Sequence, residues 1–416
     1  TCIPIRTHTH NETMALQKNY ILALNAGSSS LKASLMEGDS SEIAKFLGER
    51  LGTSSGVLHL PGGKSIEEAN MSHEQALSHI IDYLREQNML DHLVAIGHRV
   101  VHGGTVFSGS VEVGNKELQQ MKEISHLAPL HNPHNVAGIE TMRKLLADQS
   151  IPNMAVFDTS FHSTIPEVAY TYPLPKEYRD QNMRKFGFHG TSVHFVTLEA
   201  TRRLKQLHPE RNFFNIIVCH LGNGASVTAV SNGRSMDTSM GFTPLAGLMM
   251  GTRCGSIDPS LVPFACKTLD KTVDEVTHDM NKNSGIKAMN GDADMRPLIE
   301  RAKKGDADAK LAVDMFVYRL TQHIASSMIA LQGPLDAIVF TAGIGEHSVA
   351  IREKACDKLH QSLMPQLQLD RARNNQHGKE SNGVLTKQGA SPVVLVIPTD
   401  EEKMIAKECL RLLSLP

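Results

Sequence analysis

The stretch YILALNAGSSSLKASLM, residues 20–36, decides the fold expected for this chain. Its first part, Tyr20 to Asn25, is an apolar run with the length and composition of a buried strand. Small, turn-forming residues follow from Ala26 to Ser30, and a second strand-like run covers Leu31 to Met36. We therefore predict a β-hairpin whose tip is rich in glycine and serine.

The same design returns in the second half of the chain. There NIIVCH, LGNGA and SVTAV occupy residues 215–220, 221–225 and 226–230, which again read as strand, glycine-containing tip and strand. A repeat of this kind favours two structurally related domains that face each other across a shared cleft. Two unrelated hairpins of an ordinary α/β protein are the alternative.

Further buried runs end in polar or glycine-rich residues, where open α/β sheets collect their chemistry. They are Met154 to Phe157, Ala337 to Phe340 and Val393 to Ile397. Helical patterns lie between them, at Glu74 to Gln87, Ala307 to Leu331 and Glu401 to Leu413. We predict an α/β fold throughout, with Ser362 to Gly389 as a polar surface connection.

The composition excludes several classes of protein. At 416 residues the chain suggests two domains, and 41% hydrophobic with 21% charged residues is typical of a globular protein. A net charge of -2 offers no basic surface for nucleic acid or anionic lipid. Every apolar run is far shorter than the roughly 20 residues that cross a bilayer. The six cysteines form no CxxC pair, which favours reduced thiols and a cytoplasmic protein.

The first residues lack the pattern of a signal peptide, since Thr1 to Thr13 contains no apolar segment followed by small residues. We expect residues 1–17 to be a flexible extension, with Met14 just before the first strand. A weak metal site at His8 and His10 is the alternative.

Several motifs carry groups suited to anion chemistry. In NAGSSSLK, residues 25–32, small residues present donors to phosphate and Lys32 adds a charge, although the spacing is not that of a P-loop. Arg99, in GHRVVHGG, follows a short strand, and its planar fork suits a carboxylate or phosphate. An ordinary hairpin is the structural alternative for the first motif, and a salt-bridged arginine beside structural histidines is the alternative for the second.

Three more motifs place charged or titratable groups at strand ends and loops. Asp158 follows the run that ends at Phe157, and His189 stands between glycines in FGFHGTS. Asp158 could equally be a capping acid, and His189 could equally be a core histidine. Arg253 lies in the loop Met240 to Pro259, which is rich in glycine and proline. A loop of this composition around a single arginine favours a functional role over a simple connection.

Taken together, the motifs resemble the acetate kinase family of the actin-like, ribonuclease H-like superfamily. In chain order they are NAGSSSLK, GHRVVHGG, APLHNPHN, FDTSFH, FGFHGTS, CHLGNGAS, GFTPLAGLMMGTR, FTAGIGE and IPTDEE. The resemblance implies two duplicated actin-like domains with a cleft between them, one formed by residues 18–160 with 400–416 and the other by 161–399. It also implies a homodimer, and domain closure that excludes water from the reaction.

The resemblance implies transfer of the γ-phosphoryl group of ATP to acetate. Asn25 and Glu401 would hold Mg²⁺, with Mn²⁺ as an alternative ion. The implied nucleotide contacts are Lys32, His220, Leu221, Gly222, Asn223, Gly224, Asp294, Met295, Arg296, Gly343, Ile344, Gly345, Glu346 and His347. The implied contacts to the acid are Arg99, Val101, Leu130, His131, Phe188 and Pro244.

His189 and Arg253 match the family's transition-state stabilisers, and Asp158 matches its proton donor or acceptor. Yet an acid whose pKa is about 4 to 5 is ionised at neutral pH, so its attacking oxygen has no proton to remove. We therefore hold open a second role, in which Asp158 organises Mg²⁺ or orients Arg99.

The sequence departs from the family pattern at six positions, and only one of them, His347, is among the contacts that the resemblance implies. They are Val193, Ala246, Cys254, Ser256, His347 and Asp400. Propionate or butyrate kinase is the alternative within the family, since it shares every motif. One methylene changes binding by only about 1–3 kcal/mol, so the sequence does not separate acetate from propionate. A reading from another class is a nucleotide-sensing ATPase of the same fold without acyl transfer.

Overall fold

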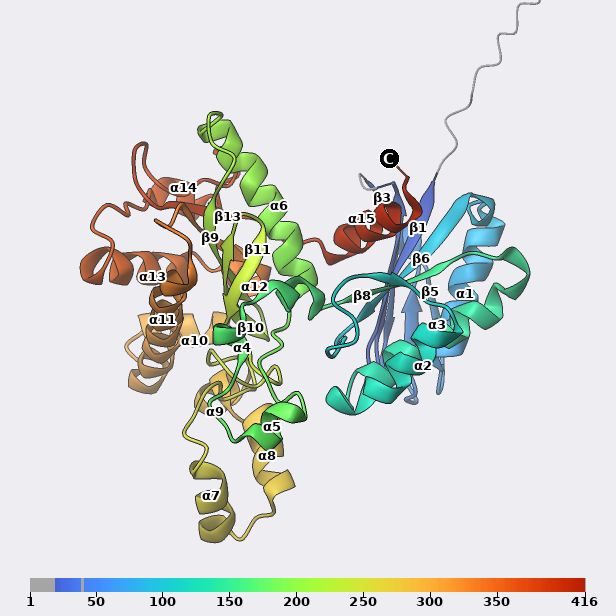
Figure 1. The fold of residues 1–416 in the computed structure, drawn as a ribbon, viewed down its shortest axis with the longest axis horizontal. Coiled ribbons are helices and arrows are strands. Elements are labelled where there is room, and N and C mark those ends of the chain that lie inside the picture. Colours follow the sequence, from blue (N-terminus) through green and yellow to red (C-terminus); the bar gives the residue numbers. More distant parts are fainter. Residues whose placement is uncertain (1–18, 39–40, 416) are drawn as a thin grey trace, which may run out of the picture.

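A computed structural model describes residues 19–38 and 41–415, which form two α/β lobes side by side (Figure 1). The predicted extension at residues 1–17 lies outside the described residues. The chain passes from the first lobe to the second after β8, and returns through the segment that joins β13 to α15 (Figure 1). The lobes are thus linked by two crossings.

The first lobe is built on an eight-stranded sheet in the order β5-β4-β3-β2-β1-β6-β8-β7. Its strands are β1 Tyr20–Ala26, β2 Leu31–Glu37, β3 Ser41–Glu49, β4 Gly56–His59, β5 Ser65–Glu68, β6 Leu93–Val100, β7 Val111–Glu112 and β8 Asn153–Phe157. The predicted first hairpin is confirmed, with Tyr20 opposite Glu37 and Ala26 opposite Leu31.

The second lobe is built on a five-stranded sheet in the order β11-β10-β9-β12-β13. Its strands are β9 Asn215–Leu221, β10 Ala225–Ser231, β11 Arg234–Thr238, β12 Ala337–Thr341 and β13 Val393–Val396. The second predicted hairpin is also confirmed, since β9 and β10 pair antiparallel from Leu221 and Ala225 onward.

Both sheets contain the same arrangement of five strands. In β3-β2-β1-β6-β8, the first three strands are antiparallel neighbours and the last two lie parallel to β1. The set β11-β10-β9-β12-β13 repeats these directions one for one. The expected duplicated α/β architecture is therefore confirmed by topology as well as by the echo of the two hairpins.

Helices cover both faces of each sheet. Their bounds are α1 His73–Glu86, α2 Asn115–Glu123, α3 Asn132–Leu145, α4 Glu167–Tyr170, α5 Lys176–Asp180, α6 Gly190–Leu207, α7 Leu261–Leu269, α8 Val273–Lys282, α9 Gly285–Asn290, α10 Met295–Lys303, α11 Ala307–Ser327, α12 Ala342–His347, α13 Val349–Ser362, α14 Arg371–Asn375 and α15 Glu401–Leu413. None of the helices in the described part of the chain combines the length and apolar character needed to cross a bilayer.

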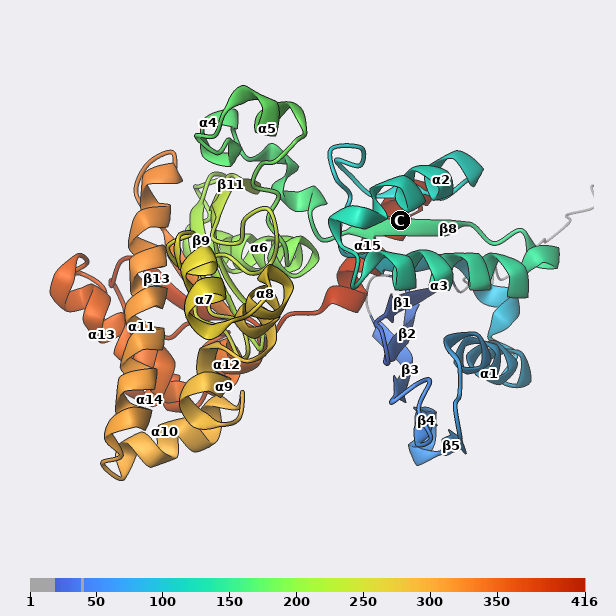
Figure 2. The same ribbon diagram turned by 90° about the horizontal axis from the view of Figure 1, so that it is seen from below.

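The final helix, α15, packs on the first sheet, on the face opposite α1 and α3 (Figure 2). Its approach is so close that a Cβ added to Gly97 of β6 would lie 2.3 Å from Ile405 Cγ2. Ile405 and Cys409 are buried there with Ile21 and Ala23 of β1. The last residues of the chain thus complete the core of the first lobe.

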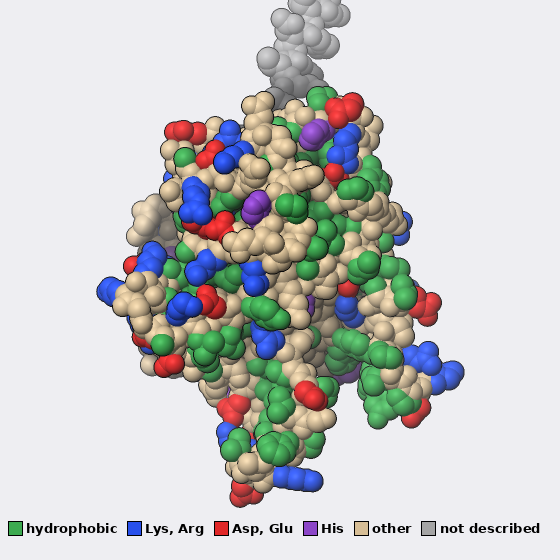
Figure 3. Space-filling view, turned by 90° about the vertical axis from the view of Figure 1, so that its left-hand side faces the viewer, with side chains coloured by type: hydrophobic (Ala, Val, Ile, Leu, Met, Phe, Trp, Pro, Cys, Tyr) green, Lys and Arg blue, Asp and Glu red, His purple; other side chains and the backbone are tan. Residues whose placement is uncertain are grey.

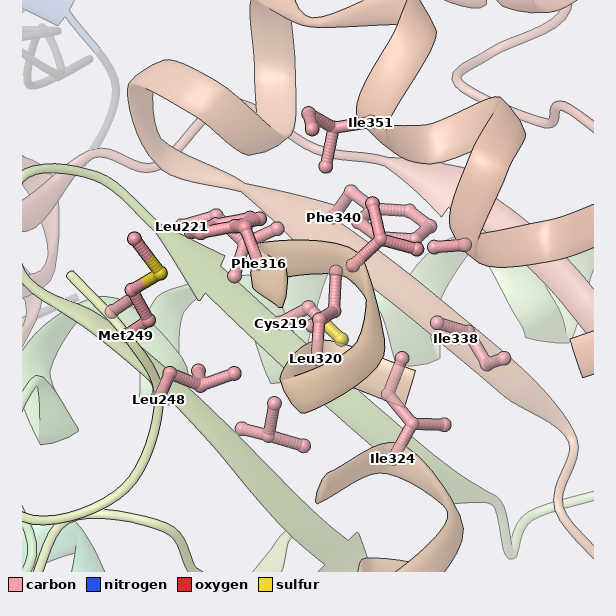
Figure 4. Packing of buried hydrophobic residues seen from close by; sticks show 14 of the residues in the cluster. Cys219, Leu221, Leu248, Met249, Phe316, Leu320, Ile324, Ile338, Phe340 and Ile351 are labelled. Carbon is pink, nitrogen blue, oxygen red and sulfur yellow. The ribbon is translucent and has the colours of Figure 1, made fainter. Parts of the chain in front are cut away.

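In the second lobe, α6 covers one face of the sheet and α11 covers the other. Figure 4 shows Phe316, Leu320 and Ile324 of α11 packed over Cys219 of β9 and Phe340 of β12. All five side chains are at most 1% exposed. Burying so much apolar area is the main source of stability for such a layer, at about 25 cal/mol per Å².

Two local predictions needed correction. The helix predicted to reach Leu331 ends at Ser327 and is followed by a 3₁₀ turn over Met328–Ala330. The stretch Ser362 to Gly389 is not simply a polar surface connection, because it contains α14 and buries Asn374 completely. The buried guanidinium of Arg352 explains this, since it donates to both the side chain and the carbonyl of Asn374.

Candidate active site

The ends of three strands of the first lobe place polar side chains at one edge of the sheet. Asn25 lies near the end of β1, Arg99 near the end of β6, and Asp158 directly after β8. These strands run parallel through adjacent positions, so their carboxyl ends coincide. Side chains far apart in sequence thereby meet.

Arg99 is the centre of this group. Its Nε and Nη2 donate to the two carboxylate oxygens of Asp158, at 3.1 and 2.5 Å, which is a two-point ion pair. Its Nη1 donates to Asn25 Oδ1 at 3.2 Å, and its Nε lies 3.7 Å from Glu401 Oε2. Burial opposes the charge of Arg99, but Asp158 and Glu401 more than offset it, so the pKa of the guanidinium is raised.

Asp158 is held from both lobes. Its side chain is 2% exposed, and Thr191 of α6 donates to Oδ1 at 3.1 Å. The backbone N–H of Gly190 donates to the Asp158 carbonyl at 2.9 Å, and a Cβ at Gly190 would lie 2.1 Å from that oxygen. Glycine is therefore required where α6 begins, because only it lets the two backbones approach so closely.

The oxygen atoms around Arg99 suit a hard divalent cation. Amide and carboxylate oxygens are the ligands that Mg²⁺ prefers, and Asn25, Asp158 and Glu401 supply them. Burial, followed by repulsion from Asp158, raises the pKa of Glu401 against the lowering effect of Arg99, so added positive charge would favour its ionised form. No cluster of three or more His, Cys, Asp or Glu able to hold a metal occurs in the described ranges.

The second lobe contributes two stacked imidazoles. The rings of His189 and His220 lie 4.1 Å apart with an interplanar angle of 22°. Burial, the neighbouring ring of His220 and the two arginines lower the pKa of His189 well below its usual value. Burial and Arg99 lower that of His220 to about 4. Both rings are therefore neutral near pH 7.

Arg253 and the glycine tip lie against these rings. A Cβ at Gly224 would lie 3.1 Å from His189 Nε2 and 3.3 Å from Arg253 Nη1. Arg253 also donates to the Pro244 carbonyl at 3.2 Å. Burial lowers the pKa of Arg253, and no carboxylate among the described residues pairs with it. An unpaired guanidinium beside neutral imidazoles is well placed to receive an anion.

The two arginines act on the same groups although they come from different lobes. After burial, the charges of Arg99 and Arg253 are the main causes that lower the pKa of His131, and both also lower that of His189. Arg253 Nη1 and His189 Nε2 lie at the same glycine tip, and Arg99 is close enough to act electrostatically on His189.

A cavity of about 670 Å³ lies beside this group, entirely in the second lobe. The predicted nucleotide contacts that line it are Gly222, Asn223, Asp294, Met295, Arg296, Gly343, Ile344 and His347. His220, Leu221, Gly224, Gly345 and Glu346 are not in its wall. Glu346 instead accepts from the backbone N–H groups of Ala342 and Thr399, at 2.8 and 3.1 Å.

The remaining predicted contacts differ in exposure. Val101 and Phe188 are 7% and 3% exposed and belong to one apolar cluster, whereas Leu130 is 64% exposed. His131 and Lys32 are exposed, and Pro244 is half-buried. Lys32 acts electrostatically on Glu401, which places it near the Arg99 group.

Sequence reasoning missed part of the cavity wall and several tethers. Ile299, Glu300 and Lys303, on one face of α10, line the cavity. For Ile299 the signal was the apolar stripe of this short helix, which also fits simple core packing, and the charged Glu300 and Lys303 carried no such signal. Asn132 and Asn135 were missed as well: both are buried and bond the backbone that follows β6, at His102 and Val101.

Most departures from the family pattern have local structural roles. Asp400 caps α15 by accepting from the Lys403 N–H at 2.9 Å, and Ser256 accepts from the Gly247 N–H at 2.9 Å. Val193 is fully buried in the core around α6. His347 lines the cavity, and nothing in the structure explains Ala246.

The chain is similar to known enzymes over almost its whole length. The sequence model of the acetokinase family matches residues 20–407. An acetate kinase of Bacillus cereus is 44% identical over 402 residues, 94% of this chain and 98% of the relative. A propionate kinase structure from Francisella tularensis has a TM-score of 0.85 at 39% identity, covering 94% of this chain and 98% of its own. Porphyromonas gingivalis acetate kinase has a TM-score of 0.84 at 34% identity, with 95% and 100% covered. With its motifs in order, its duplicated sheets and these relatives, the chain belongs to the acetokinase family.

Proposed function

We propose that this protein transfers the γ-phosphoryl group of ATP reversibly to acetate, giving acetyl phosphate and ADP. The observation that carries the proposal is that Arg253 and His189 meet at the glycine tip beside a cavity of nucleotide size, with Arg99 of the other lobe acting on the same histidine. Phosphoryl transfer needs positive charge and hydrogen-bond donors around the equatorial oxygens, and little else from the protein. Acetate kinases 44% identical over nearly the whole chain support it.

Each lobe supplies one side of the reaction in this proposal. Arg99 binds the acceptor carboxylate, while Arg253 and His189 stabilise the charge of the transferred group. Asp158 orients Arg99, since it takes up two of the guanidinium's N–H groups. The nucleotide lies in the cavity between α10 and α12, with its phosphates along the glycine tip at residues 222–224.

A divalent cation completes the proposed site. Asn25 and Glu401 would hold Mg²⁺ or Mn²⁺ with Asp158 beside them, and the ion would neutralise charge on the nucleotide phosphates. Arg99 bonds Asn25 and Asp158 and lies 3.7 Å from Glu401, so the residues that would hold the ion are already gathered around one guanidinium.

The acid's alkyl group would contact Val101 and Phe188, which are buried together. Leu130, which is 64% exposed, would join them when the lobes close around the acid. Propionate is the second candidate, favoured by the 39% identical propionate kinase of Francisella tularensis. Comparing kcat/KM for acetate, propionate and butyrate decides between them.

The test is acyl-phosphate formation with ATP and Mg²⁺, trapped by hydroxylamine as the hydroxamate. Product from a two- to four-carbon acid supports the proposal. A purified chain that hydrolyses ATP and makes no hydroxamate from any of these acids would instead be an ATPase of the same fold. Arg99→Ala is the matched variant, since the proposal requires it to abolish acyl transfer.

We also propose a homodimer and the domain division 18–160 with 400–416 against 161–399. The exposed apolar side chains of α7 support a self-association surface: Leu261, Phe264 and Leu269 are 47%, 66% and 60% exposed. Figure 3 shows hydrophobic side chains gathered on the lower projection, which Figure 1 identifies as the α7 region. Sedimentation velocity of the wild type and of Phe264→Lys tests whether the protein associates through α7. The cytoplasmic location stays a prediction.

A further inference from the structure

The stacked rings of His189 and His220 are each tied to a buried serine through the same ring nitrogen. His189 Nδ1 lies 3.0 Å from Ser226 Oγ, and His220 Nδ1 lies 2.8 Å from Ser192 Oγ. Both serines are fully buried. A neutral imidazole has one N–H and one lone pair, so the partner of Nδ1 decides which nitrogen carries the proton.

The opposite nitrogens lie toward the glycine tip. A Cβ at Gly224 would be 3.1 Å from His189 Nε2, and a Cβ at Gly222 would be 3.9 Å from His220 Nε2. Gly222 lines the large cavity. Whatever each Nε2 carries, a proton or a lone pair, therefore faces the place where phosphates would pass.

Counting donors and acceptors selects one tautomer for His189. Among the described residues, Ser226 Oγ has only His189 Nδ1 as a hydrogen-bond partner. If Nδ1 carried the proton, the buried hydroxyl of Ser226 would have no acceptor, which is costly. If the serine donates to Nδ1, its proton is used and the ring proton lies on Nε2.

The same count applies to His220 through a chain of hydroxyl groups. Ser192 Oγ lies 2.7 Å from Thr399 Oγ1, whose only side-chain partner in the described ranges is this serine. When Thr399 donates to Ser192 and Ser192 donates to His220 Nδ1, every hydroxyl proton has a protein acceptor. In the reverse order the proton of the half-buried Thr399 would need a solvent acceptor, whereas the first order satisfies every hydroxyl within the protein. Thr399 lies in the segment that crosses between the lobes, so these hydroxyl groups connect that segment to the ring of His220.

We propose that Ser226 and Ser192 hold His189 and His220 as Nε2–H tautomers, so that two parallel rings present N–H donors to phosphate oxygens at the glycine tip. Ser226 and Ser192 are thus positioning residues, and Thr399 extends the second tether. The proposal rests on the proposed phosphoryl transfer only for what the two donors contact. The tautomers themselves follow from contacts within the protein.

The experiment is long-range ¹H–¹⁵N NMR of the full chain labelled at histidine, with His189→Gln and His220→Gln used for assignment. We expect a protonated Nε2 and an unprotonated Nδ1 on both rings. Ser226→Ala and Ser192→Ala should each shift the affected ring toward a tautomer mixture and lower kcat about threefold to tenfold, as loss of one hydrogen bond implies. Ser226→Thr keeps the hydroxyl and should restore both readings.

The matched control is Ser231→Ala, which removes another buried serine hydroxyl from β10, one bonded to Asn215 Oδ1 instead. It should leave both tautomers unchanged. A wild-type ring with its proton on Nδ1, or alanine variants with unchanged tautomers, would overturn the proposal. Nε2–H rings in a protein that makes no acyl phosphate would support the tautomers and overturn the kinase function, so the two failures are distinct.

Discussion

Replacing Asp158 by asparagine keeps the shape of the side chain and removes its charge. In the structure, the carboxylate accepts two bonds from Arg99 and one from Thr191. Asparagine has a single oxygen, so at least one donor of Arg99 would face an NH₂ group instead of an acceptor. We expect turnover to fall while the pH dependence stays as it is in the wild type.

The magnitude follows from the two-point ion pair. A hydrogen bond to a charged group contributes about 1.5–3 kcal/mol, and the substitution loses one such bond and weakens the other. A total of about 2–4 kcal/mol in the placement of Arg99 corresponds to a drop of roughly 30-fold to 1,000-fold in kcat/KM for the acid, at about 1.4 kcal/mol per factor of ten. KM for ATP should change much less, because the cavity wall does not include Asp158.

The assay measures hydroxamate formation across pH for the wild type, Asp158→Asn and the exposed-site control Asp148→Asn. Near-UV circular dichroism checks that each variant is folded. A new ionisation in the pH–rate profile of Asp158→Asn would show that this carboxylate exchanges a proton in the reaction, which refutes the orienting role. An unchanged kcat/KM would refute the argument from geometry.

Three further predictions concern the cavity, the core and pH. Lys303→Ala should raise KM for ATP several-fold and leave KM for the acid unchanged, whereas Lys304→Ala, outside the cavity wall, should alter neither. Gly97→Ala should lower the free energy of unfolding by about 1–3 kcal/mol in urea titrations, because its Cβ would overlap Ile405; equal stability would contradict the close packing. Burial lowers the pKa of His98 to about 4, so as the pH falls the unfolded chain binds a proton before the folded chain does. The free energy of unfolding should therefore decrease as the pH drops from about 6.5 toward 4. At about pH 5 this residue should account for a loss of roughly 1–2 kcal/mol. The slope between those pH values should be shallower in His98→Asn, and an identical slope would count against the assignment.

Local sequence predicted the elements that local interactions define. The two hairpins, the strand before Asp158 and the helix Glu401–Leu413 appear where the apolar runs and turn residues indicated. Alternation, run length and turn chemistry act over a few residues, so they can be read from sequence. The α11 terminus and the stretch around Asn374 were misread, because tertiary contacts such as the bonds to Arg352 decide them.

The candidate site was likewise predicted in part from sequence and in part only by the fold. The order of motifs, through the family resemblance, picked out Arg99, Asp158, His189 and Arg253. That Asp158 orients Arg99 was one of two roles left open from sequence, and the folded chain supplied the two-point contact across 59 positions and joined Ser192 to Thr399 across 207. Sequence by itself therefore determined which chemical groups the chain carries and which strand ends present them. Tertiary structure decided which groups share a hydrogen bond, because that depends on distances of about 3 Å that no spacing along the chain encodes.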